Sequence, residues 1–324
     1  AGFSCDILPH HTGDIINYLE AVIENKPLPE IRVYYEGFTG TIRKITDDRY
    51  LFKGTYEILG TDIIRVTELP VGTWTGDYKE HLENLIDDGK KTKKSQIVKN
   101  YTDMSTDTSV DFKINLLPGT MNKLLPKMTD YGCNELEKRL KLYTTKTTRN
   151  MYLFDAEQKL KKYDSIIDII NAYIPVRLDT YGLRIAHLIE QLEKDVIILT
   201  NKARFIQEQC DDIIDLRRKK QQVVVELLRE RGYDTVNDDL EFKYLRSMPL
   251  SQVEEENMER LFQECHKKNV ELDELKGLTP EIMWLSELHT LKGQYNKYRS
   301  DRIERQRGVI TRVKSKLNKN AIRK

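Results

Sequence analysis

The chain has 324 residues and carries 53 basic and 52 acidic side chains, so its formal net charge is +1. This length exceeds what one compact core usually holds, and we expect two domains or one domain with a long appendage. A nearly neutral chain gives no bulk sign of nucleic-acid binding, so such a partner would have to meet a local basic patch. Charged residues make up 32% and hydrophobic residues 39% of the chain. That balance excludes general disorder and is typical of long helices that each bury a narrow stripe.

Membrane, disulfide and metal-binding classes find no support. No apolar run approaches the roughly 18 residues of a membrane span, and the opening AGFSCDILPHHTGD has neither the basic start nor the apolar stretch of a secretory signal. The cysteines at positions 5, 133, 210 and 265 share no short spacing. This argues against a disulfide scaffold or a zinc site and favours a reducing, intracellular setting. The pair His10–His11 has no closely spaced third ligand, so we predict no metal site.

Before Pro175, short runs of β-branched and aromatic residues alternate with turn signals. The apolar spacing predicts helices over 13–25 and 77–87, and a short helix before residue 140. Strands are predicted over 31–35, 41–45, 49–54, 62–69, 97–103, 108–116, 140–145 and 150–155. Residues 1–175 are therefore expected to form an α+β domain with a mostly antiparallel sheet.

After Pro175 the apolar residues recur at steps of four and three from Tyr181 to Ile213, which predicts a long helix with Pro175 in its first turn. A second series leads to Gly277, after a capping box formed by Ser251 and Glu254. We expect an antiparallel α-helical coiled coil, with residues 176–222 and 251–324 forming its arms and a return helix. Residues 223–250, which we call the knob, would form a small helical tip domain.

No catalytic constellation is visible. The sequence has no glycine-rich nucleotide loop, no zinc-binding helix and no nucleophile elbow. The acidic residues Asp211, Asp212 and Asp215 lie in the helical repeat beside Arg217 and Arg218, which favours a solvated helix face over a magnesium site.

Basic residues supply a candidate DNA-binding surface in the first domain and just before the coil. Each alone is more often an ordinary surface charge, but together they could hold phosphates without reading sequence. The candidates are Arg43, Lys44, Lys53, Arg65, Lys146, Arg149, Lys161 and Lys162. The tail from Arg299 is also basic, as a solvated helix end or as an electrostatic handle for an anionic partner.

The knob carries more large apolar side chains than a small tip is expected to bury alone. Either it associates with a second copy or it forms a local mini-core, and the pattern leaves both open. The candidate dimer-interface residues are Leu227, Leu228, Tyr233, Tyr244, Leu245, Met248 and Leu250.

A co-linear series of motifs now points to a family. In chain order these are GFSCDI (2–7), YYEGFTGTI (34–42), ELPVGTWTGDYKE (68–80), NMYLFDAEQKLKKYDS (150–165), VRLDTYGLR (176–184), LTNKARFI (199–206), RGYD (231–234), YLRSMPL (244–250) and ELDELKGLTPEIMW (271–284). On these residues the chain resembles the C-terminal half of the DNA breakage-reunion region of eukaryotic-type type IIA DNA topoisomerases.

The resemblance implies a role for each part. Residues 1–175 would be the tower that supports the arms of bent gate DNA, the coil would lead to the exit gate, and the knob would dimerise. The family's active-site tyrosine and its neighbouring arginine precede the GFSCD motif, so no catalytic residue is expected in this chain, which alone would be inactive. ATP and Mg²⁺ would serve the full-length enzyme and no cofactor this segment.

The partners implied are a second copy, through the knob, and double-stranded DNA, through backbone contacts without sequence specificity; no membrane is implied. A knob without a long acidic insertion suggests a large nucleocytoplasmic DNA virus. The protein would then act in the host cytoplasm, and otherwise in the nucleus. An alternative hypothesis is a non-enzymatic coiled-coil scaffold whose α+β head binds RNA or a partner protein; the motif series argues against it.

Overall fold

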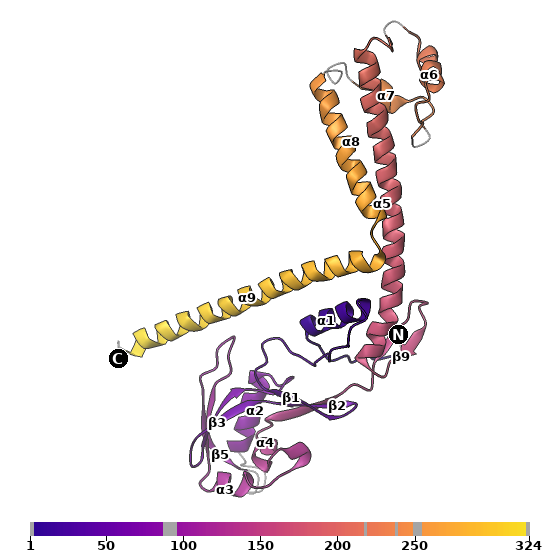
Figure 1. The fold of residues 1–324 in the computed structure, drawn as a ribbon. Helices are drawn as coiled ribbons and strands as arrows, with labels where there is room; N and C mark the ends of the chain where they lie inside the picture. The colour runs from indigo at the N-terminus through magenta and orange to yellow at the C-terminus, as the bar shows by residue number, and fades with distance from the viewer. Residues whose placement is uncertain (1–2, 87–95, 217–218, 237–238, 249–254, 322–324) are drawn as a thin grey trace. The chain divides into compact units, whose positions relative to one another are not determined.

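The computed structural model of the chain divides into two compact units (Figure 1). Residues 1–173 and 288–324 form the first, which we call the sheet unit, and residues 174–287 form the second, which we call the helical unit. The structure describes residues 3–86, 96–216, 219–236, 239–248 and 255–321, with the backbone alone for 255–258 and 306–321. The predicted Ser251–Glu254 capping box and Leu250 lie outside the described residues.

The sheet unit begins with helix α1 (Thr12–Ile23), where we predicted a helix over 13–25. Its N-cap is His11, whose Nδ1 accepts a hydrogen bond from the backbone N–H of Asp14. One face of α1 is buried through Ile16 and Tyr18. Arg32 holds the Asp14 carboxylate with a 2.7 Å bond from Nε, which ties the helix to the following segment.

Nine strands follow in three antiparallel sheets among the described residues. One has the order β1-β2-β7, from Thr41–Thr46, Arg49–Lys53 and Tyr143–Thr147. Another has the order β3-β4-β6-β5, from Thr55–Gly60, Ile63–Glu68, Phe112–Leu116 and Val98–Asp103. The last is a hairpin of β8 (Tyr152–Phe154) and β9 (Leu160–Lys162). The α+β class with mostly antiparallel pairing is confirmed.

The main core of this unit lies on the four-stranded sheet. Ile64, Val66, Phe112 and Ile114 are fully buried there, together with Leu82 of helix α2 (Thr75–Ile86). Each strand contributes alternate residues to this face, as the period of two requires. The short elements α3 (Thr120–Leu124), η1 (Asp130–Gly132) and α4 (Glu135–Arg139) follow β6, and Leu136 of α4 joins the same core.

One predicted strand is absent from the structure, and one strand was missed. Residues 31–35 form no strand, because only Val33 pairs, in a single bridge with His10. Strand β3 was missed because it follows β2 after one residue, Gly54, where an added Cβ would lie 2.3 Å from the Glu68 carbonyl oxygen. The strands predicted over 140–145 and 150–155 correspond to β7, which pairs with β2, and β8, which pairs with β9.

Helix α5 (Ile166–Cys210) starts earlier than predicted and contains Pro175. Ser165 and Asp168 cap its start reciprocally, with Asp168 N–H donating to Ser165 Oγ and Ser165 N–H to the Asp168 carboxylate. The helix therefore continues through a proline that lacks the usual N–H, a position that normally costs roughly 3 kcal/mol. Pro175 does not begin this helix.

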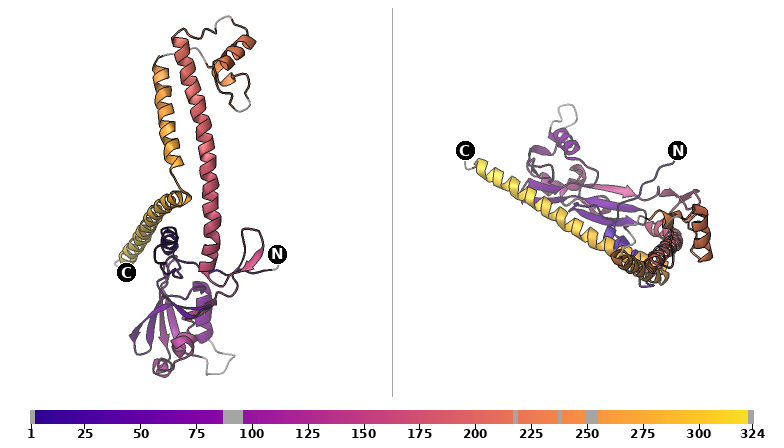
Figure 2. Two further views of the ribbon diagram at one scale, coloured as in Figure 1. Left: turned by 45° about the vertical axis from the view of Figure 1, so that its right-hand side comes forward. Right: turned by 90° about the horizontal axis from the view of Figure 1, so that it is seen from above.

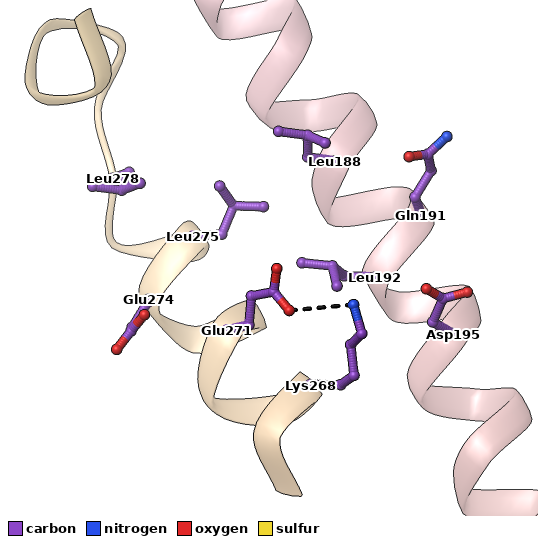
Figure 3. Close-up of a pocket in the computed structure, with 9 residues that line it drawn as sticks. All are labelled: Leu188, Gln191, Leu192, Asp195, Lys268, Glu271, Glu274, Leu275 and Leu278. Carbon is purple, nitrogen blue, oxygen red and sulfur yellow. Dashed lines mark ion pairs between the residues drawn. The ribbon is translucent and has the colours of Figure 1, made fainter. Parts of the chain in front are cut away.

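Helices α5 and α8 (Glu255–Lys276) lie side by side and antiparallel (Figure 2). Their apolar seam joins Leu192 of α5 to Leu272 and Leu275 of α8, and Leu188 packs against it. Figure 3 shows Leu188, Leu192 and Leu275. Farther along α5, Thr200 Oγ1 lies 3.3 Å from Cys265 Sγ, a residue earlier in α8. The paired positions thus run in opposite directions, as predicted for a returning arm.

The α8 helix ends before Gly277, and α9 (Pro280–Ala321) begins after Thr279, whose Oγ1 accepts from the Ile282 N–H. The end of α8 agrees with the predicted stop at Gly277. No helix among the described residues has the length and apolarity needed to cross a membrane.

Candidate functional site

The clearest basic feature of the sheet unit is a row across the sheet β1-β2-β7. Lys44 pairs with Tyr50, which in turn pairs with Lys146, so the three side chains project from the same face. We call Lys44, Tyr50 and Lys146 the lysine row. Lys146 Nζ lies 5.7 Å from the centre of the Tyr35 ring. That ring meets Phe52 edge to face at 5.4 Å, so an aromatic support lies under the cation.

The two lysines of this row are accessible to an anion. Among the described residues, no carboxylate lies within ion-pair distance of Lys146. Lys44 lies 3.0 Å from Asp47, whose side chain is fully exposed, and this hydrogen bond raises the pKa of Lys44. An exposed pair of this kind contributes little and exchanges readily for another anion.

The opposite face of the same sheet carries Arg43 and Lys53, which are tied down within the chain. Lys53 lies 2.7 Å from Glu137, which is almost fully buried. Burial lowers the pKa of Lys53, but the hydrogen bond and charge of Glu137 outweigh it and raise the pKa overall. Arg43 donates to the Tyr131 carbonyl, and Arg49 donates to the hydroxyl of the same tyrosine at 2.8 Å.

Arg65 and Arg149 are both neutralised by acidic side chains. Arg65 of β4 makes two bonds of 2.8 and 2.7 Å to the carboxylate of Asp111, which directly precedes the neighbouring strand β6. This is the strong bidentate form of an arginine pair. Arg149 donates to Asp48. Although both were predicted as DNA-binding candidates, these ion pairs leave them poorly placed to bind phosphate.

The remaining two candidates lie on the β8–β9 hairpin. Lys161 lies 5.2 Å from the Tyr163 ring centre, and Lys162 Nζ is 3.9 Å from Asp164. On the same hairpin Phe154 faces Leu160 across the strands, and both are about half exposed. The eight predicted residues thus lie on several surfaces and do not form one patch.

Sequence reasoning missed Tyr35 and Tyr50, which support or separate the lysines. Tyr35 lies outside the strands, and the register that aligns Tyr50 with Lys146 comes from β7, nearly a hundred residues along the chain.

The knob has its own core in the described part of the chain. Leu228, Tyr233 and Leu245 are buried in it, and Leu227, Tyr244 and Met248 pack against it. It is built from helices α6 (Gln221–Glu230) and α7 (Lys243–Arg246) against Phe205 of α5. These six candidate interface residues therefore contribute to a local mini-core. The exposed apolar side chains of the tip are Ile213, Val223 and Leu240.

Other chemistry has little support in the described ranges. No group of three or more His, Cys, Asp or Glu side chains there could hold a metal ion. Asp211 and Asp212 follow the end of α5, so they do not line the helix face that the repeat predicted. A cavity of about 350 Å³ beside the α5–α8 seam combines the leucines of the seam with Asp195, Lys268, Glu271 and Glu274 (Figure 3). Lys268 and Glu271 pair with each other at 3.2 Å.

Residues 1–289 match the family model that describes the A subunits of DNA gyrase and topoisomerase IV. The chain belongs to this family. It is similar to DNA topoisomerase 2 of Penicillium chrysogenum (29% identity over 95% of this chain) and of Plasmodium falciparum isolate K1 / Thailand (31% over 98%). It is also similar to DNA topoisomerase 2-alpha of Homo sapiens, with 31% identity over 89% of this chain. The chain spans only 20%, 24% and 21% of the lengths of these relatives.

The fold is similar to a crystal structure titled Plasmodium falciparum topoisomerase II DNA-binding, cleavage and re-ligation domain. The TM-score is 0.79 at 30% identity, over 93% of this chain and 42% of that one. The expected relationship to the breakage-reunion region of type II DNA topoisomerases is confirmed.

In this topoisomerase family member, a polar cluster joins the knob to the end of α5. Glu208 accepts from Arg204 at 2.8 Å, from Arg231 at 3.2 Å and from the Tyr233 hydroxyl at 2.9 Å. The Arg204 guanidinium also lies 4.6 Å from the Tyr233 ring centre. We call these four residues the Glu208 clamp. It uses the arginine of the motif LTNKARFI and the arginine and tyrosine of RGYD.

The clamp predicts a pH-dependent contribution to stability. Burial raises the pKa of Glu208, but the hydrogen bonds from Arg204 and Tyr233 and the charges of both arginines outweigh it, so the net shift is downward. A depressed carboxylate pKa stabilises the fold above its unfolded-state value, near 4.3, and this contribution disappears as the pH falls through the folded-state value.

We therefore expect Glu208→Gln to lower the free energy of unfolding by roughly 1.5–3 kcal/mol at neutral pH, the size of hydrogen bonds to a charged group. The difference from the parent should shrink as the pH falls below about 4.3. Urea unfolding followed by circular dichroism across this pH range measures both. Glu190→Gln, which changes an exposed pair with Lys194, should leave stability unchanged. A parent–variant difference that stays constant with pH would contradict the clamp.

Proposed function

We propose that this chain is the tower, coiled-coil and exit-gate part of a type II DNA topoisomerase, an isomerase that changes DNA topology by ATP-dependent double-strand passage. The observation that carries the proposal is the family match over residues 1–289. The likeness to a DNA-binding, cleavage and re-ligation domain supports it, and both argue against the alternative of an unrelated scaffold that binds RNA or a protein.

In this proposal the sheet unit supports bent gate DNA, and the lysine row is its main backbone contact. Lys44 and Lys146 offer cations that are not held by buried carboxylates, on a flat face with aromatic support. Contacts of this kind bind phosphates irrespective of sequence. Bending a duplex costs several kcal/mol, and backbone contacts on such a platform would offset this cost.

The helical unit, in the same proposal, forms the dimeric exit gate through the knob. Because Leu228, Tyr233 and Leu245 are buried within one chain, the contact with the second copy should use the exposed side chains Ile213, Val223 and Leu240. A small apolar surface suits a gate that must hold and yet part, since obligate dimers bury far larger interfaces.

The chemical step would belong to other parts of the full-length enzyme. We propose that the reactive tyrosine and its neighbouring arginine precede this segment and that ATP and Mg²⁺ act there as well, so this chain alone is inactive. The short knob further supports a source among large nucleocytoplasmic DNA viruses, and we propose the African swine fever virus enzyme as the candidate. The protein would then act in the host cytoplasm, and otherwise in the nucleus.

The lysine row predicts a defined loss of DNA affinity. Lys44→Gln/Lys146→Gln should weaken binding to a short duplex and lower the slope of log affinity against log salt by about 1–2, because each lost phosphate contact removes close to one unit. Fluorescence anisotropy over a salt series measures this.

The double variant Arg65→Gln/Arg149→Gln is the matched control, since it removes the same charge from two paired arginines. Equal losses in both variants would refute a local contact at the row. Relaxation of supercoiled plasmid by this chain with ATP and Mg²⁺ would refute the placement of the chemistry outside it.

The gate assignment predicts that the tip controls the oligomeric state. Val223→Glu/Leu240→Glu should weaken dimerisation by about ten-fold or more, since each buried charge opposes association by at least 1.4 kcal/mol. Sedimentation velocity over a concentration series measures the change. Leu183→Glu, on an α5 side chain that is 73% exposed, should leave the dimer intact. A parent that stays monomeric at micromolar concentration would contradict the gate.

A further inference from the structure

A carboxylate on α9 faces three polar groups of α5 within the helical unit. Glu287 Oε1 accepts from Arg184 Nη1 at 2.7 Å and Oε2 accepts from the Tyr181 hydroxyl, and Arg177 Nη2 lies 3.9 Å from Oε2. These α5 residues are spaced by four and three, so they occupy one helix face. The hydrogen bond from Tyr181, ahead of Arg184 and the arginine charges, lowers the pKa of Glu287.

An aromatic contact lies beside this carboxylate. Trp284, one turn earlier in α9, stacks on Tyr181 with ring centres 6.0 Å apart and planes at 30°. Both rings are nearly buried, at 4% and 2% exposure. The Arg177 guanidinium lies 4.6 Å from the Tyr181 ring centre. Tyr181 therefore joins both parts of the contact, with its hydroxyl on Glu287 and its ring on Trp284.

The link between α8 and α9 is short. Only residues 277–279 separate the two helices. Gly277 closes α8 through bonds to the Asp273 and Glu274 carbonyls, and Thr279 caps α9. Such a short break acts as a pivot, because each helix is closed by its own cap. The start of α9 contacts α5 through Glu287 and Trp284, and Met283 packs against the α5–α8 seam.

We propose that Glu287 is the pin of a releasable joint, which holds the first two turns of α9 on α5 and, when its bonds are lost, lets these turns move away and exposes Trp284. Release is accessible because the polar partners are near water. The side chains of Glu287, Arg184 and Arg177 are 42%, 51% and 38% exposed, so water can replace their bonds. The joint is inferred from these residues alone and holds whether or not the proposed gate function does.

Trp284 provides a local readout, because the chain has only two tryptophans. The other, Trp74, is 76% exposed, so Trp74→Phe removes the background without disturbing a core. In that background we expect Glu287→Gln to shift Trp284 emission to longer wavelength and to increase its quenching by acrylamide. Loss of a charge-assisted hydrogen bond changes an opening equilibrium by about ten-fold. Helix content by far-ultraviolet circular dichroism should stay at the parent level.

Two further variants distinguish a specific role of Glu287 from a general effect of removing an acidic residue from α9. Glu281→Gln makes the same change on the exposed first turn of α9 and should match the parent. Arg184→Gln removes one bond and keeps the Tyr181 hydroxyl on Glu287, so it should change quenching in the same direction by a smaller amount. It also tests the joint if Glu287→Gln unfolds the unit. The proposal would be overturned by unchanged Trp284 emission in Glu287→Gln, or in Arg184→Gln if Glu287→Gln unfolds. Equal effects of Glu287→Gln and Glu281→Gln would also overturn it.

Discussion

The structure depends on one constraint, the need to cover the apolar stripe of α5 along 45 residues. A single helix cannot bury its own stripe, so its stability comes from whatever packs on it. Within the sheet unit, Asn171 near the start of α5 accepts a bond from the buried Tyr18 of α1. Within the helical unit, Trp284, the leucines of α8 and the knob cover successive stretches of the same helix.

At both ends of the helical unit, a glutamate helps to attach another segment to α5. At one end Glu208 is met by two arginines and a tyrosine hydroxyl, and at the other Glu287 is met in the same way. The difference is burial, since Glu208 is 14% exposed and Glu287 42% exposed. Because the strength of an ion pair depends on its shielding from water, the knob attachment should be firm and the α9 joint yielding.

Local patterns predicted much of the fold because they report directly on burial. The spacing of apolar residues and the turn residues between them predicted helix α1, strands β1, β2 and β4, and the returning helix α8 with its stop at Gly277. The start of α5 was predicted wrongly because proline is common in the first turn of a helix, whereas the Ser165–Asp168 cap lies ten residues before Pro175. Sheet register was not predictable, since the partner of β2 lies far along the chain in β7.

The candidate DNA surface was less predictable than the fold. A sequence shows which residues are basic, but not that Lys53 is held by Glu137 or Arg65 by Asp111, because these pairs form between distant segments. The same limit applies to the knob. Its sequence suggested Leu228 and Leu245 as dimer-interface residues, but in the fold they are buried with Phe205 and Phe242. Resemblance to the family supplied the roles that local physics alone left open.

The pairing of α8 on α5 can be tested most directly with a disulfide, since Thr200 Oγ1 lies 3.3 Å from Cys265 Sγ. With Cys5 and Cys210 replaced by serine, Thr200→Cys should form a disulfide with Cys265 on mild oxidation, because the ends of the two side chains are in contact. Lys202→Cys points away from α8 and should stay reduced. Peptide mapping by mass spectrometry under non-reducing conditions reads the result. A Thr200→Cys chain that leaves Cys265 free, or a Lys202→Cys chain that links to it equally well, would contradict the antiparallel pairing.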